Sequence, residues 1–259
     1  MRIPRFVSHI YRNSHDIAVM SCLYDGPNKA LYEGNMDGFV GSHLRYCQDI
    51  GYDYWAFNNR LLDADRFDGL LHQHHIDWSV HHVTFGLYKW IAALYLTRII
   101  GYKAVVVIDY DTTFFKHEPF PEEMLDYKLG VTNSHAWSQV NAPSVFFFDR
   151  WLGIDSLSYE YWYNTGMFYV RNDFEYEPFL REFVDETIAI LDAEPFAMNE
   201  YDANGHDCLF KANDEIFCQL LINKTGVEPY RFDNNKWNTG DDNASTVLRH
   251  YTDKHNIPR

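Results

Sequence analysis

The sequence predicts an α/β fold with a mostly parallel central sheet flanked by helices. Before residue 115, three apolar stretches have the length and composition of buried strands, at 17–24, 52–57 and 103–108. Between them lie two stretches with apolar residues at helical spacing, 29–50 and 84–100. This alternation is typical of parallel sheets, because a helix is the usual crossover between parallel strands. Ligands of such folds bind at the carboxyl ends of the strands.

Each of these elements has a recognisable boundary in the sequence. The first strand ends at the turn-forming residues 25–28, Asp-Gly-Pro-Asn. Residues 29–50 carry apolar side chains at helical spacing, at Leu31, Met36, Phe39, Val40, Leu44 and Cys47. Gly51 and Gly101 follow the two helices, and glycine is the residue that most often ends a helix.

The second half of the chain is less regular but continues the pattern. We expect strands at 129–132, 144–148 and 166–170, and helices at 179–191 and 214–223. No internal repeat and no linker rich in glycine and serine interrupts the 259 residues. The chain is therefore expected to form a single domain, 1–259.

The net charge of −15 limits the partners of the chain. An acidic surface repels phosphate backbones and anionic membranes, so we expect no binding of nucleic acid. No apolar run reaches the roughly 20 residues of a membrane span. Met1–Phe6 is followed by polar residues rather than by the apolar core of a signal peptide, so a cytoplasmic location is expected.

Two aspartates directly follow the third predicted strand. In Val105–Phe114, VVVIDYDTTF, an apolar run leads into Asp109 and Asp111. Residues two apart in an extended segment point the same way, so these carboxylates converge and repel each other unless a cation lies between them. Oxygen ligands suit Mg²⁺ or Mn²⁺, which commonly bridge to phosphate oxygens. The pair therefore predicts a divalent metal site at the edge of the sheet.

Two classes of enzyme use such a pair of aspartates. A metal-dependent glycosyltransferase binds a nucleoside diphosphate sugar through the metal. A phosphatase of the haloacid dehalogenase type carries D-x-D-x-T after an apolar strand, with Asp109 here as nucleophile and Asp111 as general acid/base. The aspartate strand of that phosphatase normally opens its fold, whereas two predicted strands and two predicted helices precede Asp109. The glycosyltransferase is favoured, and the phosphatase stays open as an alternative.

Four segments of the chain resemble one family of glycosyltransferases. They are TFGLYKWIAALYLTRIIGYKAVVVIDYD, YNTGMFYVRN, NDEIFCQLLINKTGVEPYRFDNNKWN and RHYTDKH. Through them the chain resembles retaining glycosyltransferases of the GT-A fold, of the glycogenin-like and galactomannan galactosyltransferase-like type, from Ile17 to Lys254. The resemblance implies a Rossmann-like GT-A domain, with a nucleotide-binding half at about 15–115 and a sugar and acceptor half at about 116–259.

The first two segments imply residues that contact the donor. Lys89 matches the basic residue that reaches the donor from the helix before the aspartates. Asn164 matches the asparagine that hydrogen-bonds the donor sugar or the acceptor, and Gly166 would let the backbone approach a ligand closely. By the same resemblance, Tyr24 and Asp25 after the first strand would bind the base and the ribose.

The last two segments imply further residues at the sugar and at the metal. Asp214 matches the sugar-binding acid of the family, but Glu215 stands where the family usually has glutamine. His250 matches the third metal ligand, which would complete the site with the two aspartates. Lys254 matches the lysine that holds the diphosphate, although it follows the histidine by four residues where the family has six, and the family's glycine is absent.

The resemblance implies an activity as well as a fold. A sugar would pass from a nucleoside diphosphate donor, with a UDP-sugar expected, to a hydroxyl of a carbohydrate or other acceptor, with Mn²⁺ or Mg²⁺ as cofactor and with retention. Asn164, Asp214 and Glu215 would surround the sugar as the catalytic residues. Glu215 leaves the mechanism open, because a carboxylate near the anomeric carbon can act as nucleophile or, in an inverting enzyme, as general base. A non-catalytic carbohydrate-binding protein on this fold is a third alternative.

Overall fold

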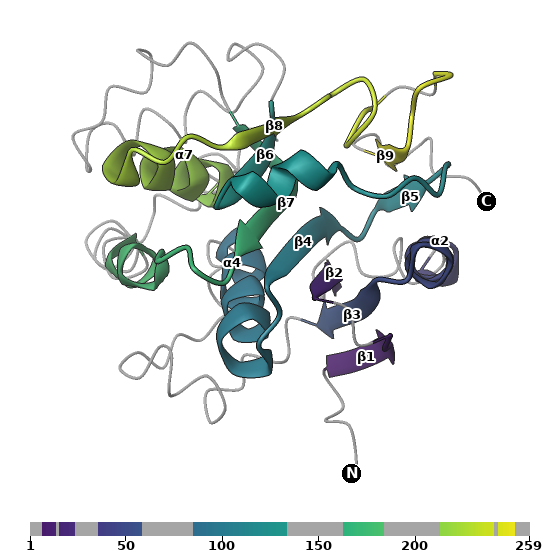
Figure 1. The fold of residues 1–259 in the computed structure, drawn as a ribbon, viewed down its shortest axis with the longest axis horizontal. Helices are drawn as coiled ribbons and strands as arrows, with labels where there is room; N and C mark the ends of the chain where they lie inside the picture. Colours follow the sequence, from purple (N-terminus) through teal and green to yellow (C-terminus); the bar gives the residue numbers. More distant parts are fainter. Residues whose placement is uncertain are drawn as a thin grey trace, which may run out of the picture.

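The computed structural model describes residues 7–13, 16–23, 36–58, 85–133, 163–183, 213–240 and 243–251 (Figure 1). The described strands are β1 (Val7–Tyr11), β2 (Ile17–Leu23), β3 (Asp53–Asn58), β4 (Ala104–Asp109), β5 (Thr112–Phe114), β6 (Leu129–Asn133), β7 (Tyr163–Arg171), β8 (Tyr230–Phe232) and β9 (Leu248–His250). The described helices are α2 (Met36–Ile50), α4 (Phe85–Tyr95) with its π-helical continuation η3 (Leu96–Ile100), the 3₁₀-helix η4 (Glu122–Asp126) and α7 (Asn213–Thr225). Residues 177–183 are also helical.

Seven of the described strands form one sheet, in the order β1-β3-β2-β4-β7-β6-β8. The central strands β3, β2 and β4 are parallel, and so are β6 and β8. β7 is antiparallel to both of its neighbours, β4 and β6, and β1 is antiparallel to β3. Within the described part of the sheet, β1 and β7 thus run against the direction of the other strands. This topology confirms the prediction of an α/β fold with a mostly parallel sheet.

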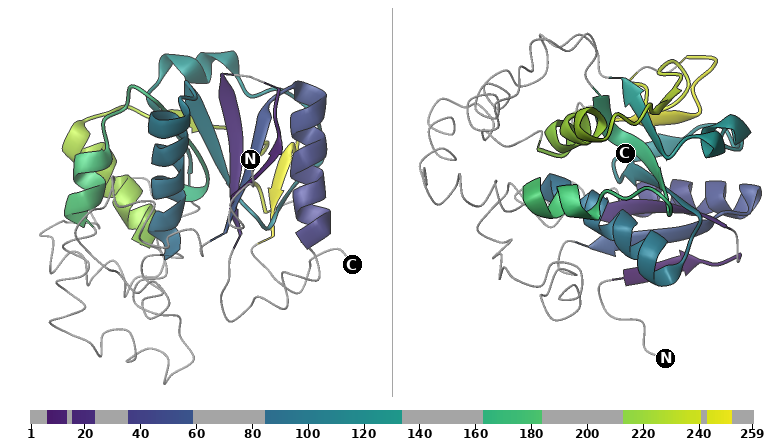
Figure 2. Two further views of the ribbon diagram at one scale, coloured as in Figure 1. Left: turned by 90° about the horizontal axis from the view of Figure 1, so that it is seen from below. Right: turned by 60° about the vertical axis from the view of Figure 1, so that its left-hand side comes forward.

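Helices cover both faces of this sheet (Figure 2). On one face lie α4, α7 and the helical residues 177–183, where Trp90 of α4 stacks on Phe168 of β7 with 4.1 Å between ring centroids. On the other face lie α2 and the two-stranded sheet of β5 and β9, where Tyr46 of α2 stacks on Phe114 of β5 at 3.6 Å. Burial of these large rings is a main source of stability, because each removes a large apolar area from water.

Local sequence signals explain the central elements. The side chains of Ala104 to Ile108 in β4 are fully buried, as expected for a continuous apolar strand in the middle of a covered sheet. Gly51 and Gly101 adopt φ values of 91° and 94° and end their helices. The Gly51 N–H donates to the carbonyl oxygen of Cys47 at 2.8 Å, which satisfies one of the last carbonyls of α2.

Most of the predicted elements are confirmed within the described residues. The strands predicted at 17–24, 52–57, 103–108 and 129–132 are present with ends shifted by at most one residue, and the predicted helix 214–223 is α7. β7 begins at Tyr163 rather than at residue 166, because polar side chains at its start conceal the strand. The predicted strand 144–148 and parts of two predicted helices, 29–35 and 184–191, lie outside the described residues. No described helix is long and apolar enough to cross a membrane.

Candidate functional site

The candidate site lies at the edge of the sheet where the parallel strands end. β4 ends at Asp109, and the antiparallel β7 begins at the same edge with Tyr163. After Asp109 the chain turns through Asp111 and continues as β5. The hydroxyl of Thr112 donates to the carbonyl oxygen of Asp109 at 2.6 Å and so fixes this turn. Both predicted metal-binding aspartates therefore stand where ligands of such folds bind.

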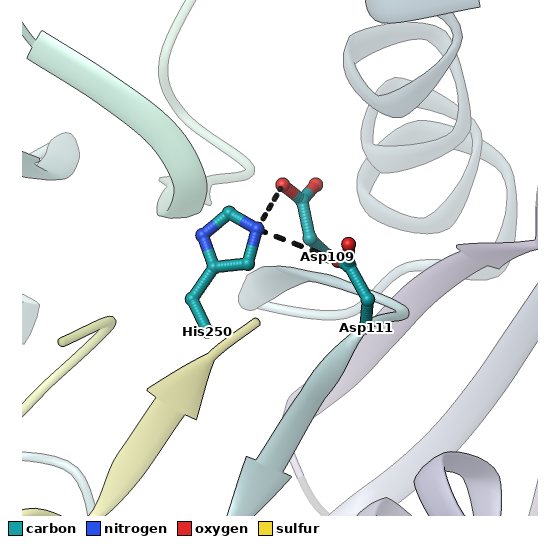
Figure 3. Close-up of side chains that lie close together, drawn as sticks. All are labelled: Asp109, Asp111 and His250. Carbon is teal, nitrogen blue, oxygen red and sulfur yellow. Dashed lines mark ion pairs between the residues drawn. The ribbon is translucent and has the colours of Figure 1, made fainter. Parts of the chain in front are cut away.

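The pairing of β5 with β9 brings His250 to the two aspartates. Thr112 lies opposite His250 in this antiparallel pair. His250 Nε2 points at both carboxylates, 3.5 Å from Asp109 Oδ2 and 3.4 Å from Asp111 Oδ1 (Figure 3). One ligand atom of each side chain lies within 4.8 Å of the other two. Two carboxylates and an imidazole at this spacing fit a divalent ion such as Mn²⁺ or Mg²⁺.

Charges in this cluster shift the pKa values of its members. Burial by itself would lower the pKa of His250, but Asp111 and Asp109 raise it above its ordinary value of 6.5. Burial by itself would raise the pKa of Asp111, but the interaction with His250 lowers it below its ordinary value of 3.8. In the metal-free protein His250 offsets the repulsion between the carboxylates when it is protonated, and a divalent ion would take over that task.

Lys89 of α4 binds two carboxylates at the same edge. Its ammonium lies 2.8 Å from Asp109 Oδ1 and 2.7 Å from Asp214 Oδ2, and it donates to the carbonyl oxygen of Thr165 at 3.0 Å. These contacts use all three donors of the ammonium, and the side chain is only 9% exposed. Burial by itself would lower the pKa of Lys89, but Asp109 and Asp214 raise it above its ordinary value. Lys89 is therefore a charged link between the predicted metal site and the predicted sugar-binding acid.

The first turn of α7 contributes both predicted acids. Asp214 is buried and accepts a hydrogen bond from the hydroxyl of Thr165 as well as the contact from Lys89. Burial by itself would raise the pKa of Asp214, but the charge of Lys89 lowers it below its ordinary value. The positive end of the helix dipole also favours carboxylates in a first turn. Asp214 is therefore an ionised group inside the site.

Asn164 connects Glu215 to the rest of the site. Asn164 Nδ2 donates to Glu215 Oε1 at 2.9 Å. Asn164 Oδ1 accepts from the backbone N–H of Gly166 at 2.8 Å and from Asn238 Nδ2 at 2.7 Å. The structure thus brings the three predicted catalytic residues, Asn164, Asp214 and Glu215, to one end of β7 and α7.

A bulge in β7 sets the direction of these side chains. Val131 of β6 is opposite Phe168, yet the next residue, Thr132, is opposite Asn164. Four positions along β7 therefore correspond to one position along β6, and β7 bends away from its neighbour at this point. The bend frees the Thr165 carbonyl to accept from Lys89. Bulges are frequent next to active sites because they redirect side chains in this way.

Gly166 lies in the bulge, where three side chains of the candidate site approach its backbone. A Cβ atom at this position would lie 2.8 Å from Asn164 Oδ1 and 2.9 Å from both Asn238 Oδ1 and His250 Cε1. Carbon atoms essentially never approach so closely, so only glycine fits without displacing a side chain of the site. Gly166 thereby lets Asn164 and Asn238 on one side, and the predicted metal ligand His250 on the other, pack against the same point of the backbone.

His43 of α2 supports the aspartate turn, a role that was not predicted from the sequence. His43 Nε2 lies 2.8 Å from the carbonyl oxygen of Thr112 and donates to it. His43 Nδ1 therefore accepts from the hydroxyl of Tyr54 at 3.0 Å, which also lies 2.7 Å from Ser21 Oγ. Burial lowers the pKa of His43 to about 4, although the hydrogen bond to Thr112 and the charge of Asp111 oppose this shift. A neutral imidazole therefore holds the residue that follows Asp111.

A signal for this role was present in the helical periodicity. His43 lies three residues after Val40 and four before Cys47, so it belongs to the face of the helix that turns inward. A histidine on an apolar face has to find polar partners when it is buried. The identity of those partners depends on contacts between distant segments, which periodicity does not supply.

Thr165 and Asn238 are two further residues of the candidate site that were not predicted from the sequence. Thr165 contacts both Lys89 and Asp214, and Asn238 donates to Asn164. Both lie within the segments that carry the resemblance, Thr165 directly after Asn164 and Asn238 as the last residue of the third segment, but neither was assigned a role there. Three of the predicted donor-binding residues, Tyr24, Asp25 and Lys254, lie outside the described residues and stay predictions.

Comparisons with known proteins agree with this geometry at the level of the fold. No protein-family model and no curated protein matches the sequence. The apo structure of mouse xyloside xylosyltransferase 1 is similar, with a TM-score of 0.50 and 9% identity over 94% of this chain and 99% of that chain. The apo structure of the WbbM bifunctional glycosyltransferase is similar, with a TM-score of 0.50 and 14% identity over 93% of this chain and 46% of that chain.

The chain has a glycosyltransferase fold. This confirms the GT-A-like architecture that the sequence predicts. A glycosyltransferase involved in the glycosylation of the major capsid of PBCV-1 is also similar, with a TM-score of 0.48 and 12% identity over 92% of this chain and 95% of that chain. At these identities the likeness concerns the fold, so the chemistry has to be argued from the residues of the site.

Proposed function

We propose that this protein transfers a sugar from a nucleoside diphosphate donor to a hydroxyl acceptor such as a glycan. A UDP-sugar is the favoured donor. The observation that carries the proposal is the cluster of Asp109, Asp111 and His250 at the carboxyl edge of the sheet. Asp109 and Asp111 come from one turn, whereas His250 comes from the distant strand β9. Convergence of these three groups on one point has a direct explanation if they bind a divalent ion.

Mn²⁺ or Mg²⁺ held by Asp109, Asp111 and His250 would offset the negative charge that develops on the leaving diphosphate. The protein itself supplies further positive charge through Lys89, whose ammonium binds Asp109. Tyr24 and Asp25 would bind the base and ribose, and Lys254 would bind the diphosphate. These three assignments rest on the resemblance in the sequence alone.

The sugar would lie against the residues of β7 and α7. Asp214 is ionised and buried, so it can accept hydrogen bonds from sugar hydroxyls. Asn164 and Glu215 form one hydrogen-bonded unit beside it. Glu215 is the candidate nucleophile if the anomeric configuration is retained and the candidate general base if it is inverted. Retention is the outcome that the resemblance favours.

A panel of donors tests this proposal. Thermal unfolding and titration calorimetry would be measured with UDP, GDP and their common sugars, with and without Mn²⁺, on the wild type and on Asp111→Ala. A ligand at about 100 times its dissociation constant stabilises the folded state by about 2.7 kcal/mol, or roughly 5–10 °C for a chain of this size. Asp173→Ala is the matched control, because it removes an exposed carboxylate just beyond the opposite end of β7.

We expect Mn²⁺-dependent stabilisation by one nucleotide sugar in the wild type and in Asp173→Ala, and its loss in Asp111→Ala. Proton NMR of the product would then report whether the anomeric configuration is retained. Absence of nucleotide binding together with hydrolysis of a phosphate ester in Mg²⁺ would support the phosphatase instead. Binding of glycans without any binding of metal or nucleotide would support the non-catalytic alternative.

A further inference from the structure

We propose that Asn238 is a positioning residue, which fixes the orientation of the Asn164 amide and through it the position of the Glu215 carboxylate. The proposal rests on the proposed function, because it gives Glu215 a defined place in the sugar site. No role for Asn238 was predicted from the sequence. It lies between β8 and β9, whereas Asn164 opens β7 and Glu215 lies in the first turn of α7.

The directions of the hydrogen bonds follow from the chemistry of the groups. An ionised Glu215 carboxylate only accepts, so Asn164 has to present its Nδ2 donor to Glu215 Oε1, 2.9 Å away. The backbone N–H of Gly166 only donates, which independently requires that Asn164 Oδ1 face Gly166. Asn164 Oδ1 therefore faces Asn238 as an acceptor, and Asn238 has to offer its Nδ2 donor at 2.7 Å.

These bonds leave Asn164 with one orientation. Its Oδ1 has two lone pairs, and the donors from Gly166 and Asn238 occupy both. The second N–H of Asn238 donates to Thr132 Oγ1 at 3.1 Å, and the Thr132 hydroxyl in turn donates to the backbone oxygen of Asn164 at 3.1 Å. Asn238 thus fixes both the side chain of Asn164 and, through Thr132, its backbone.

Two unfavourable features of Asn238 accompany this arrangement. Asn238 has a φ of 58° and is the one residue other than glycine with positive φ in the described part of the chain. Its Oδ1 is buried and has no hydrogen-bond partner among the described residues. A buried acceptor without a partner opposes folding, and an unusual backbone conformation at a site points to function. Both the positive φ and the unpartnered Oδ1 accompany a conformation in which the two N–H donors of Asn238 contact Asn164 and Thr132.

The backbone next to Asn238 also holds the strand of the metal ligand. The Thr239 N–H donates to the carbonyl oxygen of Leu248 at 3.1 Å, and the His250 N–H donates to the carbonyl oxygen of Thr239 at 2.9 Å. Asn238 and Thr239 together therefore connect β6 and β7 to β9. The orientation of Glu215 and the position of His250 thus depend on the same short segment.

The substitution Asn238→Asp tests the direction of the hydrogen bonds. Aspartate has nearly the same shape but offers no donor, so its carboxylate would lie against Asn164 Oδ1 as one acceptor against another. Turning the Asn164 amide over relieves this clash but gives up the bond from the Gly166 N–H, and it directs Asn164 Oδ1 at the Glu215 carboxylate. We expect a decrease of about 4–8 °C in melting temperature and a loss of about tenfold or more in kcat. The KM for the nucleotide sugar should change much less, because the Asn238 side chain contacts Asn164, whereas the strand of His250 is held by the backbone of Thr239, which the substitution leaves in place.

Rescue by Glu215→Gln is the decisive measurement, because it needs no knowledge of the substrate. Glutamine can donate to the reversed Asn164 amide, whereas glutamate cannot. In the Asn238→Asp background, Glu215→Gln should therefore raise the melting temperature, recovering about half of the loss. In the wild-type background, where Asn164 already donates to residue 215, the same change should not raise it. Equal shifts of melting temperature in the two backgrounds would overturn the proposal.

Asn238→Gly removes the side chain without backbone strain, because glycine adopts a φ of 58° freely. We expect this variant to stay folded and to lose kcat to a similar extent as Asn238→Asp, and wild-type kcat in this variant would also overturn the proposal. Asn172→Asp is the control, because it makes the same chemical change just beyond the opposite end of β7. It should leave kcat and melting temperature unchanged.

The proposal and the proposed function fail in different ways. If the wild type binds no nucleotide sugar with Mn²⁺, the proposed function is wrong, but the rescue of melting temperature still tests the hydrogen-bond directions. If the wild type transfers sugar and the two backgrounds respond equally to Glu215→Gln, the function stands and the role of Asn238 is wrong.

Discussion

The ammonium of Lys89 lies 2.7 Å from a carboxylate oxygen of Asp214, although the two residues come from helices far apart in the sequence. The same ammonium lies 2.8 Å from Asp109, so one buried cation holds two carboxylates that would otherwise repel each other. The side chains of Lys89 and Asp214 are 9% and 11% exposed, so water screens this network weakly. Through Lys89, the network connects the predicted metal ligand Asp109 to the predicted sugar-binding residue Asp214.

Lys89→Met should destabilise the protein strongly, because methionine has a similar shape but leaves two buried carboxylates without their cation. Removal of one partner from a buried ion pair typically costs about 3–5 kcal/mol. The change is measured by urea denaturation at neutral pH. Asp214→Asn in the Lys89→Met background should recover part of the loss, because it removes one of the unpaired charges. A further loss of stability in the double variant would contradict this account.

The pH dependence of the Lys89 network has a defined sign. The pKa of Asp214 is lowered below 3.8, so its contribution to stability is present above that pH and is lost as the pH falls through the lowered value. The pKa of Lys89 is raised above 10.5, so its contribution is present below that pH and is lost only at higher pH. In Lys89→Met the buried Asp214 has lost the cation that lowers its pKa, so the difference in unfolding free energy between wild type and variant should be larger at neutral pH and shrink as the pH falls. A difference that instead peaks in acid would contradict the assignment.

Gly166→Ala should damage the site more than the fold. The added methyl group would press on Asn164, Asn238 and His250, all at less than 3.0 Å. We expect a loss of about 1–3 kcal/mol in stability and a loss of about tenfold or more in kcat, together with weaker Mn²⁺ binding. Gly38→Ala in α2 is the matched control, because a Cβ there meets no atom within 4 Å. That change should stabilise the helix by about 0.5–1 kcal/mol and leave activity unchanged. Wild-type activity in Gly166→Ala would contradict this prediction, because the site would then accommodate the methyl group without losing its geometry.

The part of the site that could be predicted from sequence is the part encoded in continuous segments. Val105 to Ile108 form an apolar strand, and the rule that ligands bind at strand ends then places Asp109 and Asp111. The start of α7 was predictable for a similar reason, because Asp214 and Glu215 are acidic residues that favour the first turn of a helix. In both cases local chemistry and the final structure agree.

The rest depends on contacts between distant segments, which no local pattern specifies. β5 and β9 have only three residues each, too few for a periodic signal, yet their pairing brings His250 to the aspartates. The sequence supplied His250 only through a resemblance. The beginning of β7 was missed because Asn164 and Thr165 are polar, and their burial depends on partners in α4 and α7.

His43→Gln and His43→Leu should separate the hydrogen bond of His43 from its packing. Glutamine can still donate to the Thr112 carbonyl. Leucine can neither donate to the Thr112 carbonyl nor accept from the Tyr54 hydroxyl, so both bonds that the imidazole makes are lost. We expect His43→Leu to lose about 2–4 kcal/mol of stability and to weaken Mn²⁺ binding, and His43→Gln to lose less of both. Calorimetric titration with Mn²⁺ measures the second effect. Equal Mn²⁺ affinity in both variants and the wild type would show that His43 supports the fold and not the metal site.

His43 also predicts a change of stability with pH. Burial lowers its pKa to about 4 from an ordinary value of 6.5, so the unfolded chain binds a proton at His43 more readily than the folded protein. Its effect is therefore absent above pH 6.5, and stability is lost as the pH falls from 6.5 towards 4. Denaturation curves of the wild type should show this loss, and His43→Gln should reduce it. An unchanged pH slope in His43→Gln would assign the loss to other groups.

His250 should make metal binding dependent on pH, because its pKa is raised whereas that of His43 is lowered. Asp111 and Asp109 raise its pKa above 6.5, so in the metal-free protein its charge stabilises the fold below that pH, and this contribution is lost as the pH rises through the raised value. A metal ligand has to be a neutral imidazole, so Mn²⁺ competes with the proton and its affinity should increase over the same range. Calorimetry in two buffers of different ionisation enthalpy measures the proton released on binding. The Mn²⁺ affinity of His250→Gln should be lower by about tenfold or more and should depend little on pH in this range. His117→Gln is the control, because it alters a partly exposed histidine of a surface ion pair, and it should bind Mn²⁺ as the wild type does. Unchanged proton release in His250→Gln would exclude His250 as a metal ligand.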